Sequence, residues 1–400
     1  MTTLAERPIG SLPRLSPPTP TDIDDSLFTE LCAELFASLP RSDQRAKGTT
    51  YVRGLLRAEG RKSIRKLASV SAGAVSEQGL HHFMCSSTWD WNPIRATLAR
   101  WVVRTLPVQA WVVRPMVTPK AGEHSVGVDR GFSAEAGQML NAQHAAGVWA
   151  AFDESCSPVN WRLHLTRTWL DDPVKRNCAA IPDDADVETS GSCAVAAYLE
   201  AMAFSGLPAR PVVLDARSTD APSIVRRLRA AGAPLFVRIN AGQLLVPAHR
   251  VLPGRGAAPV AAQQIMAAVH DLRRPVYAPR PWPGGSSAGM LAAVVPVRLP
   301  DFGRGGRELA LMGLWERGRG GPVAYWLTSL TTAGPATLVG LSRLMDRVDE
   351  DFERITDRMG IRDYAGRSYD GWHRHVTLVS AAHTIIALNS VGFTEGSYAS

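Results

Sequence analysis

The stretch WVVRPMVTPKAGEHSVGV, residues 111–128, decides the fold. Within Trp111–Arg114, the adjacent β-branched residues Val112 and Val113 predict a buried strand. A turn that contains Pro115 follows, and residues His124–Val128 predict a second strand. This stretch therefore predicts a hairpin at the beginning of a sheet.

Further strands and helices follow the hairpin. Residues His144–Ala151 predict a third strand, and the short apolar runs 210–215 and 235–240 predict two more. Helical patterns cover 193–204 and 222–232, and the acidic, proline-interrupted stretch 171–190 predicts a loop. Alternation of strands and helices predicts an α/β fold.

The rest of the chain divides by composition. Residues 1–21 are rich in Pro, Ser and Thr and predict a disordered leader, and residues 22–105 predict a helical N-terminal domain. We assign 106–240 to the first part of the α/β domain. Short β-like runs at 241–330 predict a β-rich insertion, and 331–400 supplies a closing helix, 335–359, and the C-terminal part.

Composition limits the function classes. The net charge of +7 and the pI near 9.4 are compatible with a nucleic-acid partner, or equally with an Arg-rich solvated surface. Five cysteines without a C-x-x-C pair argue against a disulfide framework and a structural zinc site, and we expect a cytoplasmic protein. No apolar run of membrane-spanning length occurs, so we expect no membrane partner.

Pro119–Gly122 followed by His124–Val128 resembles the motifs P-K-K-G and H-S-V-G-V of IS701-type transposases, of the DDE superfamily. Further similar runs, in chain order, are Tyr51–Leu56, Gly60–Ser63, Trp161–Leu165, Tyr364–Ser368 and Gly371–Leu378. The resemblance covers roughly residues 39–400 and implies a ribonuclease-H-like mixed sheet with a β-rich insertion and a helical N-terminal domain.

The resemblance also implies a metal-binding triad of carboxylates, of which this chain matches one. Asp215 stands at the second position, whereas Arg114 and Arg354 stand where the family has Asp and Glu. A guanidinium cannot supply the oxygen ligands of Mg²⁺, so we predict neither a metal site nor a cofactor. Glu350 lies one helical turn before Arg354, about 6 Å along the axis, which is too far to replace that Glu.

Other residues predict contacts with nucleic acid or a role in catalysis. Arg61, Lys62, Arg65 and Lys66 form a basic cluster, which holds phosphates or is a solvated helix face, and Lys120 and His124 join the predicted nucleic-acid-binding set. His373 is either a general base facing the cleft or a buried structural histidine. Asp215 is either catalytic or the N-cap of the helix at 222–232.

Three functions are compatible with this pattern. The first is a transposase-derived protein that binds tRNA or DNA without cutting it. The most specific version is an aminoacyl-tRNA-dependent transferase of specialised (antibiotic) metabolism. It would use Asp215, Arg114, Arg354 and His373 on a small amine or hydroxylamine acceptor. The second is a DNA-binding regulator without catalysis. The third is a transposase with relocated carboxylates such as Asp129 or Glu350.

Overall fold

The structure, a computed structural model, describes residues 24–70, 75–133, 138–248, 258–276, 289–300, 308–318 and 320–391. The leader predicted at 1–21 lies outside these residues. Among the described residues, no helix is both long and apolar enough to cross a membrane.

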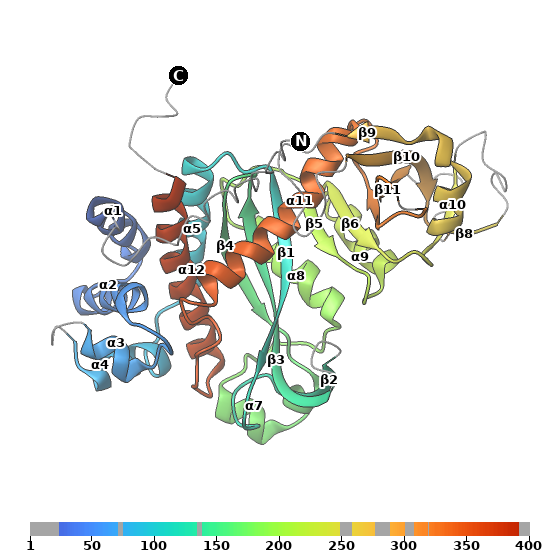
Figure 1. Cartoon of the computed structure of the whole chain (residues 1–400). Coiled ribbons are helices and arrows are strands. Elements are labelled where there is room, and N and C mark those ends of the chain that lie inside the picture. Colours follow the sequence, from blue (N-terminus) through green and yellow to red (C-terminus); the bar gives the residue numbers. More distant parts are fainter. Residues whose placement is uncertain are drawn as a thin grey trace, which may run out of the picture.

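A mixed sheet of twelve described strands forms the centre of the molecule (Figure 1). Its main path runs β2-β3-β1-β5-β6-β12-β11-β10-β7-β8, with β4 paired to β3 and β9 paired to β10. The strands are β1 Ala110–Pro119, β2 Val128–Ser133, β3 Gln138–Ala151, β4 Cys156–Leu163, β5 Val212–Asp215, β6 Leu235–Ile239, β7 Leu244–Pro247, β8 Val260–Ala261, β9 Arg274–Val276, β10 Met290–Arg298, β11 Leu309–Glu316 and β12 Ala324–Thr328.

Five of these strands make the core of the α/β part, and the sequence predicted four of them, β1, β3, β5 and β6, but not β4. β3 runs antiparallel to both of its neighbours, β4 and β1, and β5 and β6 continue from β1 in parallel. The apolar residues of β1 and β5, such as Val112 and Val213, are buried because helices cover both faces. The predicted α/β class is confirmed, and the sheet is consistent with a ribonuclease-H-like fold.

The hairpin predicted at 111–128 is wrong in its second strand. β1 continues through Pro115 to Pro119, and β2 begins at Val128 and pairs with β3 instead of β1. Pro115 is tolerated because β5 pairs only with Trp111–Val113, so the missing N–H falls where that edge of β1 has no parallel partner.

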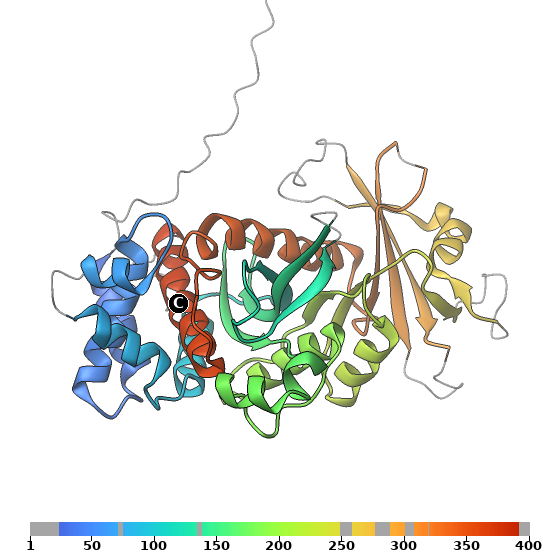
Figure 2. The same ribbon diagram turned by 90° about the horizontal axis from the view of Figure 1, so that it is seen from below.

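Helices cover the two faces of this sheet. Figure 2 shows α11 (Pro335–Asp351) on one side and α8 (Ser190–Met202) and α9 (Ala221–Ala230) on the other. The stretch predicted as a loop at 171–190 is corrected in part, because Pro173–Ala179 forms helix α7. Its start is fixed by Asp172, whose side chain accepts hydrogen bonds from the backbone N–H groups of Val174 and Lys175.

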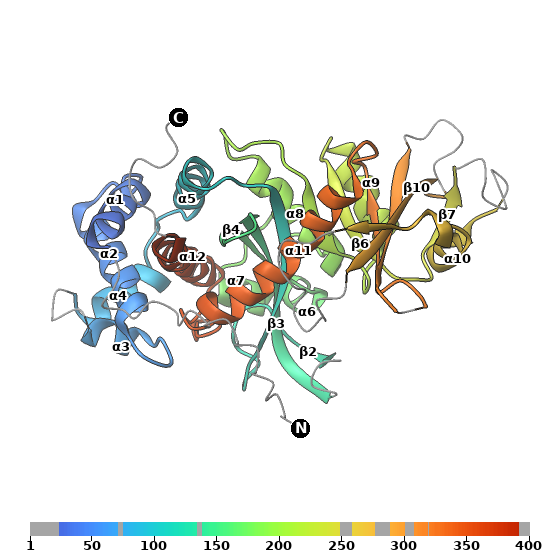
Figure 3. The ribbon, with the colours of Figure 1, turned by 45° about the horizontal axis from the view of Figure 1, so that its top comes forward.

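The predicted closing helix, 335–359, is interrupted. α11 ends at Asp351 and is followed by a turn of π-helix, Phe352–Thr356, which widens the helix at Arg354. The next long helix, α12 (Tyr369–Val391), lies between the N-terminal helices and β4 (Figure 3). Its side chains from Gly371 to Leu388 are buried.

Helices also form the N-terminal part, as predicted. They are α1 Asp25–Phe36, α2 Ser42–Arg57, α3 Ile64–Ser69, α4 Glu77–Cys85 and α5 Asn92–Thr105. α2, α4 and α5 pack on α12, so the apolar residues of this part and of the sheet form one continuous core.

The stretch 241–330 is rich in strands, as predicted. It contributes β7–β12 with the short helix α10 (Ala262–Ala268), and β12 joins it to β6 of the core.

Candidate functional site

Arg114 and Asp215 lie side by side on two adjacent parallel strands, where the pairing between β1 and β5 ends; we call this position the strand ends. The β1–β5 pairing runs to Val113 and Leu214, and Arg114 and Asp215 are the next residues on each strand. Side chains alternate along strands, so both lie on one face of the sheet. α11 crosses that face over β1 and β5 (Figure 1).

Arg114 is held by α11 and by the π-turn behind it. Its Nε donates to Asp349 Oδ1 at 2.7 Å, and its guanidinium carbon lies 3.7 Å from the centre of the Phe352 ring. Its side chain is 17% exposed and that of Asp349 is 56% exposed. Burial lowers the pKa of Arg114 from its usual value, and the charge of Asp349 partly offsets this.

Asp215 is held by its own turn. Its carboxylate accepts hydrogen bonds from the backbone N–H and the Nε of Arg217, at 2.9 to 3.0 Å, and pairs with Arg217 Nη2 at 2.6 Å. The alternative in which Asp215 caps the following helix is wrong. Asp220 is the N-cap of α9 and accepts from the backbone N–H of Ser223.

A second arginine and a second acid lie beside this pair. Arg238 on β6 is opposite Asp215 in the β5–β6 register, and its guanidinium lies 5.9 Å from the Trp326 ring centre. Asp346 on α11 lies near enough to Arg238 for the charge of Arg238 to act to lower the pKa of Asp346. Burial acts more strongly and raises that pKa to about 6. Arg238 Nε and Asp346 Oδ2 are buried and have no hydrogen-bond partner among the described residues.

The strand ends thus carry alternating charges instead of a set of acids. We call this group the charge cluster: Arg114, Arg217 and Arg238 with Asp215, Asp346 and Asp349. A site for Mg²⁺ needs carboxylate oxygens free to converge on the ion, whereas two of these carboxylates are ion-paired. Within the described part of the chain, no group of three or more His, Cys, Asp or Glu side chains is placed to hold a metal ion.

Arg354 lies in a different environment. Its Nη2 contacts Asp351 Oδ1 at 3.2 Å, and Asp351 is 1% exposed and also accepts the thiol of Cys156 at 3.3 Å. Among the described residues, Arg354 forms no ion pair or hydrogen bond with Asp349, the partner of Arg114, or with Asp215. The π-turn therefore directs Arg354 toward β4, away from the charge cluster.

His373 is buried inside the protein. Its ring stacks on Trp91 with centroids 4.7 Å apart, and its Nδ1 accepts from Arg95 Nη2 at 3.0 Å. The side chain is 3% exposed, and burial holds its pKa well below the usual range. This placement favours the structural alternative over a base facing the cleft.

Neither carboxylate of the relocated-triad hypothesis lies in the charge cluster. Glu350 pairs with Arg347 at 3.1 Å, on the side of α11 that faces Glu154. Asp129 lies on β2 and accepts from the Thr168 hydroxyl at 3.4 Å. Asp346 and Asp349 are the acids of α11 that face the strand ends.

The basic cluster at 61–66 divides into two pairs. Lys62 is 5% exposed and its Nζ donates to the carbonyl of Ala58, while Lys66 Nζ donates to the carbonyl of Glu59. Arg61 and Arg65 are exposed, and their side chains form no hydrogen bond or ion pair with the other described residues. These two guanidinium groups are thus available to a ligand.

Lys120 and His124 follow β1 in the chain and differ in their contacts. Lys120 Nζ donates to the carbonyls of Arg362 and Tyr364 at 3.1 and 2.7 Å, so it fastens the loop before α12. Arg61 is close enough to Lys120 to lower its pKa, although burial is the larger cause. His124 is exposed.

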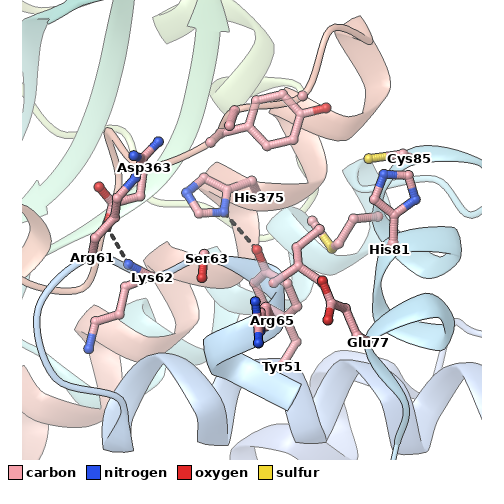
Figure 4. Close-up of a pocket in the computed structure, with 15 residues that line it drawn as sticks. Tyr51, Arg61, Lys62, Ser63, Arg65, Glu77, His81, Cys85, Asp363 and His375 are labelled. Carbon is pink, nitrogen blue, oxygen red and sulfur yellow. Dashed lines mark hydrogen bonds between the residues drawn. The ribbon is translucent and has the colours of Figure 1, made fainter. Parts of the chain in front are cut away.

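A pocket of about 270 Å³ opens between Arg61, Lys62 and Arg65 on one side and α4 on the other (Figure 4). We call it the Arg61 pocket. Arg61 and Arg65 line one part of it, and Glu77 and His81 of α4 line another. At its base the Tyr51 hydroxyl donates to His375 Nδ1 at 2.9 Å, because His375 Nε2 is engaged with the carbonyl of Gly360 at 2.8 Å.

Sequence reasoning missed the acids of α11 and the pocket. Asp346 and Asp349 are three residues apart, which places them on one helix face, and this spacing was a usable signal. Tyr51, Tyr364 and His375 come together from segments more than 300 residues apart, and no local pattern indicates that.

Residues 34–274 match the family model described as DDE superfamily endonuclease. This range contains Arg114 and Asp215 but ends before α11. No match was found among curated proteins.

Proposed function

We propose that this chain, which belongs to the DDE superfamily endonuclease family, is an IS701-type transposase derivative that binds nucleic acid without cutting it. The family implies contact with nucleic acid in general. The finer proposal concerns the strand ends, where a nuclease of this kind would hold divalent metal ions.

The ion pair between Arg114 and Asp349 is the observation that carries the proposal. At 2.7 Å it places a cation on β1 where the pairing with β5 ends, and it engages a carboxylate of α11. Arg217 does the same to Asp215 at 2.6 Å. Because a divalent ion would be repelled by these guanidinium groups and would compete with them for the same oxygens, the residues present do not fit such an ion.

The test is binding and cleavage of labelled duplex DNA by the full chain, with and without Mg²⁺ or Mn²⁺. We expect retarded complexes in both conditions, and no nicking. Metal-dependent nicking that disappears in Asp215→Asn but persists in Asp183→Asn, a change at an exposed acid, would contradict the proposal. Absence of any complex with DNA or RNA would contradict the binding part.

A sharper form of the proposal is an aminoacyl-tRNA-dependent acyl transferase. An amine or hydroxylamine nitrogen would attack the ester carbonyl at the 3′ end of the tRNA. The new C–N bond forms as the ester C–O bond breaks, and the proton lost by nitrogen passes to the ribose oxygen. Asp215 would relay that proton, and Arg114 would hold a phosphate.

Turnover with total aminoacylated tRNA and an added hydroxylamine distinguishes this form from a regulator. Metal-independent loss of one amino acid from tRNA, abolished by Asp215→Asn and retained by Asp183→Asn, is the expected result. Duplex binding without such loss would overturn the transferase form and support the DNA-binding regulator.

A further inference from the structure

We propose that the Arg61 pocket binds a single unpaired nucleotide at the end of a nucleic-acid strand. The inference rests on the proposed nucleic-acid binding and adds a site that lies apart from the charge cluster. The pocket is formed by α2, α3, α4, the loop before α12, and α12 itself.

Size is the first argument. About 270 Å³ is close to the lower end of small-molecule pockets, which begin near 300 Å³. The space suits one nucleotide and excludes a double helix. Tyr51 and His375, 2% and 1% exposed, close the base of the pocket, so a strand cannot pass through it, and a terminal nucleotide fits it best.

Charge is the second argument. The lining contains the cations Arg61, Lys62 and Arg65 and the acids Glu77 and Asp363. Asp363 is engaged, because its Oδ2 accepts the backbone N–H of Lys62 at 2.7 Å. Arg61 and Arg65 remain exposed and can each bind a phosphate through two N–H groups.

Aromatic and polar groups are the third argument. Tyr364 lines the pocket, and its ring lies 5.7 Å from that of His375. Because these residues are only 6% and 1% exposed, the inner wall presents a small aromatic area against which a base can pack. Glu77 and His81 are one helical turn apart on α4 and face the pocket together (Figure 4). The Glu77 carboxylate can accept hydrogen bonds from an exocyclic amino group of a base.

The loop that carries Tyr364 is fixed in place. Lys120 Nζ donates to the Arg362 and Tyr364 carbonyls, and the N–H of Asp363 donates to the carbonyl of Gly360 at 2.9 Å. Lys120 is therefore a positioning residue of the pocket. This separates its role from that of Arg61 and Arg65, which we expect to touch the phosphate.

The experiment compares a blunt labelled duplex with the same duplex carrying unpaired nucleotides at its 3′ or 5′ end. We expect the full chain to bind one overhang at least ten-fold more tightly than the blunt end. Ala365→Trp fills the pocket from an exposed position without changing the charge. It should abolish the preference and leave blunt-duplex affinity unchanged.

Two charge variants complete the test. Arg61→Glu with Arg65→Glu should remove the preference as well. Arg57→Glu, a change of the same charge at an exposed position of α2 outside the pocket, should retain it. Thermal melting of each variant checks that it is folded.

The outcomes are separable. Equal affinity for blunt and overhanging ends, or a preference that survives Ala365→Trp in a folded variant, would overturn the pocket proposal while leaving duplex binding intact. Loss of binding to every nucleic acid by the unmodified chain would instead overturn the proposed function and the pocket together.

Discussion

Arg114 joins β1 to α11 through one ion pair and one ring contact. Arg114→Ala should destabilise the protein by roughly 1 to 2 kcal/mol, because it removes both the pair with Asp349 and the contact with Phe352. The cost stays moderate because Asp349 is 56% exposed and can be rehydrated. Urea unfolding at low and high salt measures it, and high salt should reduce the ion-pair part.

A double-mutant cycle with Asp349→Asn isolates that pair. We expect a coupling free energy of about 1 kcal/mol between the two positions. Arg358→Ala, at an exposed position nearby in the chain, is the control and should change stability little. A coupling of zero would mean that the Arg114–Asp349 contact contributes nothing to stability.

Asp346 should make the stability of the folded protein depend on pH with a sign opposite to that of most acidic residues. Its folded pKa, about 6, is higher than the usual value of 3.8, so the folded state binds the extra proton between these values. Stability therefore falls as pH rises from about 4 to about 6. Allowing for partial exposure, Asp346→Asn should gain about 1 to 2 kcal/mol relative to wild type between pH 4 and pH 7.

Chemical denaturation at a series of pH values checks this. Asp184→Asn, at an exposed acid, should leave the pH profile unchanged. A variant whose stability difference from wild type is constant from pH 4 to pH 7 would contradict the assignment of a raised pKa to Asp346.

Residue contacts of this kind could not be read from the sequence. Substitution of Arg114 and Arg354 for acids indicated a changed site, but the two arginines lie in separate clusters because a π-turn lies between Asp349 and Arg354. The partner of Arg114 is 235 positions away in the chain, and only the docking of α11 on β1 brings it close.

At the scale of elements, α12 carries three buried histidines, His373, His375 and His383. Burial lowers the pKa of all three, for His375 and His383 to about 4. Each is neutral when folded and charges more readily when unfolded. Their contribution is thus present above about pH 6.5 and is lost as pH falls. For His375 and His383 the loss is complete only below about pH 4 and amounts to a few kcal/mol each.

Unfolding by urea at pH 7 and pH 5 measures this loss. His383→Gln should make the fall in stability between these values smaller, although it lowers stability at pH 7 because the bonds to Thr356 and the Cys156 carbonyl change. His270→Gln, at an exposed position, should leave the slope unchanged. An identical slope in wild type and His383→Gln would contradict the lowered pKa.

Elements with a strong local pattern were predicted, and those defined by distant partners were not. β5 and β6 followed from short apolar runs, and the helical N-terminal part followed from apolar spacing. The predicted start of β2 was wrong because β2 pairs with β3 and not with β1. The helix α7 was not predicted, because its acidic, proline-containing sequence was interpreted as a loop. Pro173 in the first turn and Asp172 as the N-cap are both compatible with a helix.

At the scale of the whole molecule, Arg95 connects three parts of the fold. From α5 it donates to Thr377 on α12 at 2.7 Å, to Asn160 Oδ1 at 2.9 Å and to the Trp161 carbonyl at 2.7 Å on β4. It is 2% exposed, and burial lowers its pKa to about 10, so it stays charged among neutral acceptors. The N-terminal helices and the sheet are therefore joined through a buried cation.

Because of this connection, we expect residues 22–105 to unfold together with the sheet and not as a separate domain. Arg95→Met should destabilise the protein by about 3 kcal/mol, because it leaves the acceptors Asn160 and Thr377 and the Trp161 carbonyl without their donor. Hydrogen exchange should show α2, α12 and β4 losing protection together in the variant, since all three belong to one core. Arg100→Met, at an exposed position of the same helix, should leave exchange unchanged. Faster exchange in α2 alone, with β4 still protected, would mean that the N-terminal helices unfold independently and that residues 22–105 are a separate unit.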